Sequence, residues 1–221
     1  MTCRNCQRSI GQGVILEDLE EIRRSVGARR AAYMSLTPAA FAQEAFQADL
    51  APLNNSGASG TANLALEGDQ LSTDIASEGL APNLPHAQHI HGLEQAMSEC
   101  PTLANDQDGD GLVNTTEGQP SYGPILTSLT TEGDTSPESG LAVDRFPVAN
   151  EDGTLTYGRT FGVPSTVAER LGEFAIVQHG VDLNGNGAYD EEAAGPSDLD
   201  PSLPQEATIP ANCGRIVPVG G

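Results

Sequence analysis

The sequence predicts an all-β protein, a Greek-key antiparallel β-sandwich or barrel, with a short helical extension at its N-terminus. Its composition is the first reason: only 4% of residues are aromatic, none is tryptophan, and 25 glycines and 15 prolines favour turns. The second is that about eight short segments of alternating polarity, separated by polar turns, follow one another along the chain. Residues 1–45 lack these signals, so we divide the chain into an N-terminal extension, 1–45, and a β-domain, 46–221.

Within the extension, apolar residues at helical spacing predict one helix near residues 16–33. Leu16, Leu19 and Ile22 recur among glutamates and arginines, as on one face of an amphipathic helix. Ahead of them, Cys3 and Cys6 form a CxxC pair, a pattern compatible with half of a zinc site or with a redox pair. Because no second CxxC and no nearby histidine complete a zinc set, we interpret this pair as non-functional.

The end of the extension has some features of an export signal. Four arginines between residues 23 and 30 precede the short apolar stretch 31–42, which ends in the small-x-small pattern Ala40-Phe41-Ala42. Ser35, Thr37 and Pro38 interrupt this apolar stretch. The segment is therefore interpreted either as a degenerate export signal or as a short helix that tethers the N-terminus.

The β-domain is predicted to contain a hairpin followed by further short strands. Apolar residues alternate over 62–66 and again over 71–75, and the polar sequence Glu67–Gln70 between them is typical of a tight turn. The same alternation and turn signals predict strands at 86–91, 123–130, 141–148, 153–162, 174–180 and 207–218.

The charge of the chain excludes some classes of partner. The formal net charge is −21, no residue is a lysine, and no basic patch occurs beyond residue 30. A chain this acidic is not expected to bind nucleic acid or an anionic membrane surface. No apolar stretch is long enough to span a membrane. Calcium ions, or a salty or extracellular medium, are more natural counterparts of this charge.

The four histidines occur at only two places in the sequence. His86, His89 and His91 lie in LPHAQHIHG, and His179 lies in a second apolar segment, AIVQHG. In a strand, His89 and His91 would point to the same face, and a second strand could bring His179 to the same place. Imidazole suits copper, zinc or iron, so these rings predict a mononuclear metal centre with an open position. The plainer alternative is that they are core or turn residues.

An acidic loop between the two histidine segments fits a calcium-binding pattern. Carboxylates at positions 1, 3, 5 and 12, a glycine at position 6 and a backbone carbonyl at position 7 match the twelve-residue EF-hand loop. The predicted ligands are Asp106, Asp108, Asp110, Leu112 and Glu117. Because prolines and a glycine flank the loop, we do not expect a full exiting helix. The alternative is an acidic loop that is merely solvated.

A second, weaker version of this loop follows His179. The candidate ligands are Asp182, Asn184, Asn186 and Asp190, but position 12 is Ala193. Asn-Gly sequences are equally typical of tight turns, so both readings stay open. Asp182 is also close enough in sequence to orient the ring of His179 through a hydrogen bond.

The residues FQADL and SGASGTANLALEGDQLSTDIASEGLAPNLPHAQHIHG resemble the opening of a chordin-type (CHRD) domain, and the chain from about 45 to 218 is similar to the copper/zinc superoxide dismutase fold. This resemblance implies copper ligands at His89, His91 and His179, with His86 as a fourth ligand or a buried neighbour. The closing sequence NCGRIV resembles the dismutase's last strand and implies a Cys100–Cys213 disulfide. Such a bond indicates an oxidising compartment, extracellular or periplasmic.

The chain also departs from the dismutase pattern. No histidine lies between His91 and His179, so we expect no zinc at the dismutase-type position. Pro210 stands where the family has the arginine that guides superoxide, three residues before the last cysteine.

Two functions of different classes follow from these patterns. The first is a secreted copper protein whose dismutase-like centre turns over superoxide, with calcium in the acidic loop. The second is a non-catalytic, calcium-stabilised extracellular module of CHRD type that acts in adhesion or surface assembly. Metal ions, and in the first case superoxide, are the expected partners.

Overall fold

The computed structural model of the chain describes residues 42–220. The predicted helix near 16–33, the Cys3–Cys6 pair and the export-like segment up to Phe41 lie outside the described residues. Between residues 42 and 220, no helix is long and apolar enough to cross a membrane.

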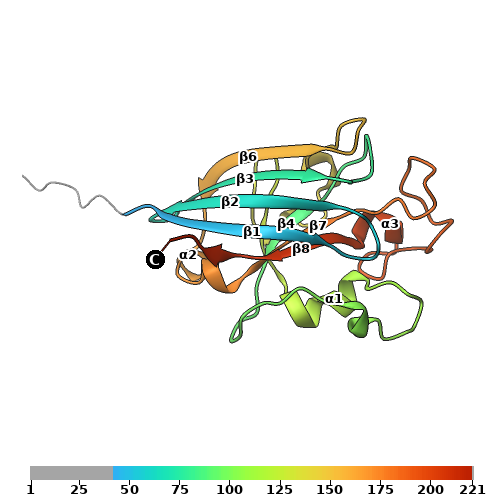
Figure 1. Ribbon diagram of the computed structural model, residues 1–221, viewed down its shortest axis with the longest axis horizontal. Helices are drawn as coiled ribbons and strands as arrows, with labels where there is room; N and C mark the ends of the chain where they lie inside the picture. Colours follow the sequence, from blue (N-terminus) through green and yellow to red (C-terminus); the bar gives the residue numbers. More distant parts are fainter. Residues whose placement is uncertain (1–41, 221) are drawn as a thin grey trace, which may run out of the picture. The chain divides into compact units, whose positions relative to one another are not determined.

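Nine antiparallel strands form one continuous sheet, which confirms the predicted all-β fold (Figure 1). Eight of them lie in the order β5-β4-β7-β8-β1-β2-β3-β6, and β9 pairs with β1. The connections β3 to β4, β5 to β6 and β6 to β7 therefore cross from one half of the sheet to the other. The strands are β1 Glu44–Pro52, β2 Ser59–Glu67, β3 Gln70–Glu78, β4 Gln88–His91, β5 Ile125–Ser128, β6 Leu155–Gly162, β7 Ala175–His179, β8 Pro210–Arg215 and β9 Val217–Pro218.

The predicted hairpin is present as β2 and β3, and it extends further than the sequence pattern indicated. Leu66 pairs with Leu71 and Glu67 with Gln70, so the turn falls where it was predicted. Gly68 has a φ of 63°, a left-handed conformation that glycine adopts without the steric cost of a side chain. Leu64 and Ile75 turn to the buried face, while Asn63 and Asp74 face solvent.

Two predicted strands differ from the structure. The segment 141–148 contains no strand; its centre is a 3₁₀ turn, Val143–Arg145. The Arg145 guanidinium donates to the Ser139 hydroxyl and to the carbonyl of Asp134 in this turn, and Val148 makes only an isolated bridge with Pro85. The segment 207–218 starts in a short helix, and only its later part forms β8 and β9.

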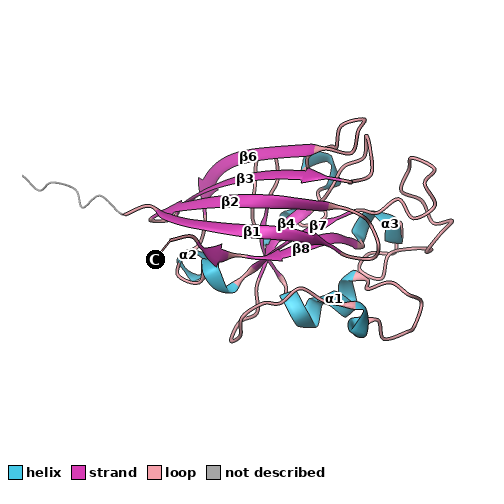
Figure 2. Ribbon diagram, in the orientation of Figure 1, coloured by secondary structure: helices cyan, strands magenta, loops and turns pink. Residues whose placement is uncertain are grey.

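Three short helices lie at the margins of the sheet (Figure 2). They are α1 Thr115–Tyr122, α2 Ser165–Ala168 and α3 Gln205–Thr208. Helix α1 begins at Thr115, the tenth position of the first acidic loop, and is only eight residues long, so the loop ends in a short helix. Asn114 caps the helix by accepting the backbone N–H of Glu117, and Pro120 is tolerated inside a helix of only eight residues.

The core is apolar and is shared by both halves of the sheet. Burial of each large aliphatic side chain contributes about 1.5–3 kcal/mol, so these residues fix which face of every strand turns inward. Fully buried members from strands and connecting segments are Leu71, Ile90, Leu129, Leu155, Leu171, Ile176, Ile209 and Ile216.

Candidate metal centre

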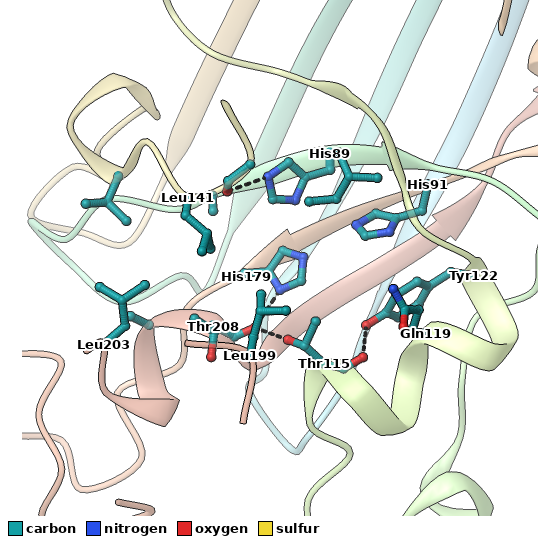
Figure 3. Close-up of a pocket in the computed structure, with 15 residues that line it drawn as sticks. His89, His91, Thr115, Gln119, Tyr122, Leu141, His179, Leu199, Leu203 and Thr208 are labelled. Atoms are coloured by element: carbon teal, nitrogen blue, oxygen red, sulfur yellow. Dashed lines mark hydrogen bonds between the residues drawn. The ribbon is translucent and has the colours of Figure 1, made fainter. Parts of the chain in front are cut away.

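Strands β4 and β7 bring three of the four histidines together. All residues of both strands are buried, and His89 lies opposite Val177 in their antiparallel pairing. Irregularities in register occur between Ile90 and His91 and between Gln178 and His179, next to two of the rings. Such bulges re-aim side chains, and here the rings of His89, His91 and His179 converge (Figure 3).

The three rings are close enough to share one ion. One nitrogen from each of His89, His91 and His179 lies within 4.8 Å of the others, so the group could hold a metal ion. The ring centroids of His89 are 5.5 Å from those of His91 and 5.2 Å from those of His179. The structure thus brings the three predicted histidines together. His91 and His179 are 88 residues apart in the sequence, but they meet because β7 pairs with β4.

Each ring has one nitrogen held by a backbone carbonyl and one nitrogen left free. A carbonyl oxygen only accepts, so the held nitrogen carries the hydrogen and the other presents a lone pair. The free, buried nitrogens are Nδ1 of His89, Nε2 of His91 and Nε2 of His179. The hydrogen-bond distances are 3.0 Å from His89 Nε2 to Gly140 O, 2.8 Å from His91 Nδ1 to Gly123 O and 2.6 Å from His179 Nδ1 to Thr208 O.

Burial keeps these rings neutral near pH 7. Loss of hydration lowers the pKa of His91 from 6.5 to about 3 and that of His179 to about 4. The pKa of His89 falls well below its usual value, first because of burial and then because His179 and His91 lie close by. Neutral imidazole is the form that binds metals, so little competition from protons is expected in the folded protein.

The carbonyls that orient the rings come from outside β4 and β7. Gly123 directly follows helix α1 and has a φ of 89°, in the left-handed region, where it passes close to the backbone of Gly92. Thr208 ends helix α3, and its carbonyl accepts a second hydrogen bond from the Thr115 hydroxyl of helix α1. Nothing in the sequence pattern pointed to these partners, because backbone carbonyls leave no residue-type signal.

His86 does not join the other three histidines. Its Nδ1 lies 2.9 Å from the carbonyl oxygen of His179 and its Nε2 lies 3.0 Å from that of Ala81. Each of its ring nitrogens thus faces a carbonyl, whereas His89, His91 and His179 each have one nitrogen without a hydrogen-bond partner. Tyr189 meets its ring edge-on, at 6.1 Å between centroids. The structure therefore gives no support to His86 as a fourth ligand and puts it against the backbone behind His179.

A cavity of about 60 Å³ opens over the three rings. Its walls are largely apolar, and Tyr122 at its edge lies 4.6 Å from His91 between ring centroids. No arginine and no other charged side chain from residues 42–220 lines it. Pro210, at the expected arginine position, begins β8 opposite His179.

The first acidic loop is folded around its own carboxylates. Oxygens of Asp106, Asp108 and Glu117 lie within 4.8 Å of one another, so this group too could hold a metal ion. Asp110 is outside the group, and its carboxylate accepts the N–H of Leu112. Neither acidic loop takes part in the salt bridges found within residues 42–220. The carboxylates of both loops therefore have no cationic side chain as a partner in this part of the chain.

The second acidic loop repeats the hydrogen bonds of the first. In both, the leading aspartate accepts N–H groups from the fourth and sixth residues: Gly109 and Gly111 donate to Asp106, and Gly185 and Gly187 donate to Asp182. In both, a glutamate accepts from the second and ninth residues: Gln107 and Asn114 donate to Glu117, and Leu183 and Asp190 donate to Glu206.

Glu206 thus takes the place that Glu117 has in the first loop, although it belongs to helix α3. Its side chain is fully buried, whereas Ala193 occupies the twelfth position along the chain. Sequence reasoning missed Glu206 because a pattern of contiguous positions cannot find a ligand from another segment. The carboxylates of this loop do not form a group as close as that of the first loop among the described residues.

Asp182 does not orient His179. Its two carboxylate oxygens accept N–H groups of its own loop, and the ring of His179 is held by Thr208. Asp182 makes these Asx-type hydrogen bonds within its own loop, because a short side chain reaches nearby backbone N–H groups most easily. It is therefore not available to hydrogen-bond the ring of His179.

The disulfide implied by the resemblance is present. Cys100 and Cys213 are bonded, and Cys213 lies on β8 opposite Val177 of β7. Tyr122, Val177 and Cys213 belong to one small buried cluster, with Cys100 packed against it. The bond therefore fastens the segment before the first acidic loop to the sheet that carries His179.

Comparison with known proteins adds no family to this description. No protein-family model matches the chain, and no curated protein matches its sequence.

Proposed function

We propose that this protein binds one copper ion through His89, His91 and His179 and acts outside the cytoplasm as a redox protein. The observation that carries the proposal is the set of three buried ring nitrogens that have no hydrogen-bond partner and face one another. A buried polar atom without a partner costs about 1–3 kcal/mol, and a bound ion would remove that cost for three atoms at once.

The choice of copper rests on the ligand type and the compartment. An all-imidazole site binds Cu(II) more tightly than other divalent first-row metals, following the Irving–Williams order. The Cys100–Cys213 disulfide supports secretion or a periplasmic location, because such bonds persist in oxidising compartments. The resemblance to the dismutase fold favours copper as well, and no histidine lies between residues 91 and 179 to build its zinc site.

Bound copper would supply one-electron chemistry. In the activity that the resemblance implies, one superoxide is oxidised to dioxygen, and a second takes up the electron and two protons to give hydrogen peroxide. Since none of the arginines in residues 42–220 lines the cavity to attract an anion, we expect superoxide turnover far below the diffusion limit.

Copper loading followed by EPR tests the proposal. One equivalent of Cu(II) should give a single signal with nitrogen hyperfine splitting, and His89→Ala or His179→Ala should abolish it. His86→Gln is the matched control, because His86 is buried in the same segment but has both ring nitrogens on carbonyls. A signal that survives in both alanine variants, or no uptake of copper by the folded wild type, would refute the proposal.

The acidic loops support calcium as a second cofactor of the proposed protein. Four carboxylates lie within the first loop without a cationic partner among the described residues, and hard oxygen ligands of this kind suit calcium. For the second loop, Glu206 supports the same proposal, with Asp182, Asn184, Asn186 and Asp190 as the remaining candidate ligands.

Calorimetry separates the two loops. We expect two calcium ions per chain in the wild type, one in Glu117→Gln and one in Glu206→Gln. Glu191→Gln is the control, since Glu191 is exposed beside the second loop and should leave both ions bound. If copper fails to bind while calcium raises the melting temperature, the non-catalytic, calcium-stabilised module remains as the function.

A further inference from the structure

The cavity above the three histidines has an apolar mouth. Leu141, Val143 and Leu199 line it and are 40%, 38% and 44% exposed, so three of the large exposed hydrophobic residues of the protein surround one opening. Ile125, Leu203 and Ala207 continue the apolar wall inward. A ligand on its way to the rings must shed water against these side chains, which is costly for an ion.

The polar groups of the wall are mostly engaged within the protein. The Thr115 hydroxyl donates to the carbonyl of Thr208, and the Tyr122 hydroxyl donates to the carbonyl of Thr115. Gln119 is the exception: its side chain is exposed, lines the cavity beside Tyr122 (Figure 3), and makes no hydrogen bond within residues 42–220. The group offered to a ligand is therefore an uncharged amide.

The described charged side chains of the protein do nothing to attract an anion to the cavity. A negative charge lies nearby instead: the carboxylate of Asp198 accepts the N–H of Thr116, next to Thr115 in the cavity wall. The four described arginines, Arg145, Arg159, Arg170 and Arg215, do not line the cavity. The whole chain carries a formal charge of −21, which adds to the repulsion.

We infer that the metal centre takes a small uncharged ligand, of the class of dioxygen, carbon monoxide or hydrogen peroxide, and discriminates against anions such as superoxide. The cavity volume of about 60 Å³ is a few times the ~10–15 Å³ that one water molecule needs, so the cavity suits a ligand of a few heavy atoms. This inference rests on the proposed copper centre, and it changes the substrate class that the dismutase resemblance implies.

Two probes test the inference on the full chain loaded with copper. Azide is added to the Cu(II) form and followed by its charge-transfer absorption, and carbon monoxide is added to the Cu(I) form and followed by infrared absorption. In Leu199→Arg, one cation at the mouth should tighten azide binding roughly tenfold and leave carbon monoxide binding within about twofold. Val217→Arg is the control, because it adds the same charge at an exposed position on β9 that does not line the cavity.

The outcomes separate this inference from the proposed function. Weak azide binding in the wild type and in Val217→Arg, with tighter binding in Leu199→Arg and carbon monoxide bound by all three, supports the inference. Wild-type protein that binds copper but takes azide as tightly as Leu199→Arg, or that does not bind carbon monoxide, overturns the inference alone. Protein that takes up no copper overturns the proposed function and the inference with it.

Discussion

The histidine centre and the two acidic loops are both candidate metal sites, but they are built in opposite ways. The histidines lie on buried strands, and each ring keeps one nitrogen free of any hydrogen bond. The leading carboxylates of the loops, by contrast, already accept backbone N–H groups within their own segments. The histidine centre therefore already presents free ligand atoms to a metal ion. The loops are also folded, but their carboxylate charge is not balanced by a cationic side chain within residues 42–220.

The strongest test of this contrast is to cut the covalent link between the two regions. Replacing Cys100 and Cys213 by serine should lower the free energy of unfolding by about 4–5 kcal/mol, since the bond closes a loop of more than 100 residues. Urea denaturation of the oxidised wild type and the double variant measures the loss. A loss below 1 kcal/mol would show that the acidic-loop region does not depend on its attachment to β8.

Acid should act on the histidine centre of the metal-free protein. The pKa of His179 is about 4 in the folded protein and 6.5 in the unfolded chain. Between pH 4 and pH 6.5 the unfolded chain therefore binds more protons than the folded protein. Stability is therefore complete above pH 6.5 and falls as the pH drops, by about 3 kcal/mol for His179 when pH 4 is reached. Urea midpoints at pH 7.5, 6 and 5 give the slope, and His179→Gln should reduce it to the part contributed by the remaining buried histidines. An unchanged slope in that variant would contradict the assignment.

The two regions should also be coupled through helices α1 and α3. Glu117 and Glu206 lie on these helices, and Gly123 and Thr208, whose carbonyls orient two rings, lie at their ends. Removing calcium should weaken copper binding about tenfold, and copper should strengthen calcium binding by the same factor. Competition titrations with and without a calcium chelator measure both. Equal copper affinity in the two conditions would mean that the regions are independent.

The smallest effect is expected from the hydroxyl of Thr115. Thr115→Val removes one of two hydrogen bonds to the carbonyl that orients His179, at a cost of about 1 kcal/mol in stability. Copper affinity should fall by less than tenfold, while calcium binding stays unchanged. Thr116→Val is the control, because Thr116 is exposed and its side chain makes no hydrogen bond among residues 42–220. A shift in the control as large as that in Thr115→Val would exclude a specific role.

Alternating polarity was enough to predict the β2–β3 hairpin and the shared direction of His89 and His91, because both depend on the period of a strand. It failed at 141–148, where a 3₁₀ turn held by local backbone hydrogen bonds and by the side chain of Arg145 replaces a strand. The carbonyls that hold the rings could not be predicted, since any residue type supplies a carbonyl. Glu206 was missed for a related reason: its position depends on how α3 packs beside a distant loop.

The pairing of β4 with β7 has a consequence for folding. Gln88 lies opposite Gln178, so the centre exists only after two segments far apart in the sequence have joined in the sheet. Contacts of such long range form slowly, because the entropy of closing the chain is lost before they stabilise it. A refolding chain should therefore acquire its three-nitrogen pocket late, and metal uptake during refolding would report the moment at which β4 and β7 pair.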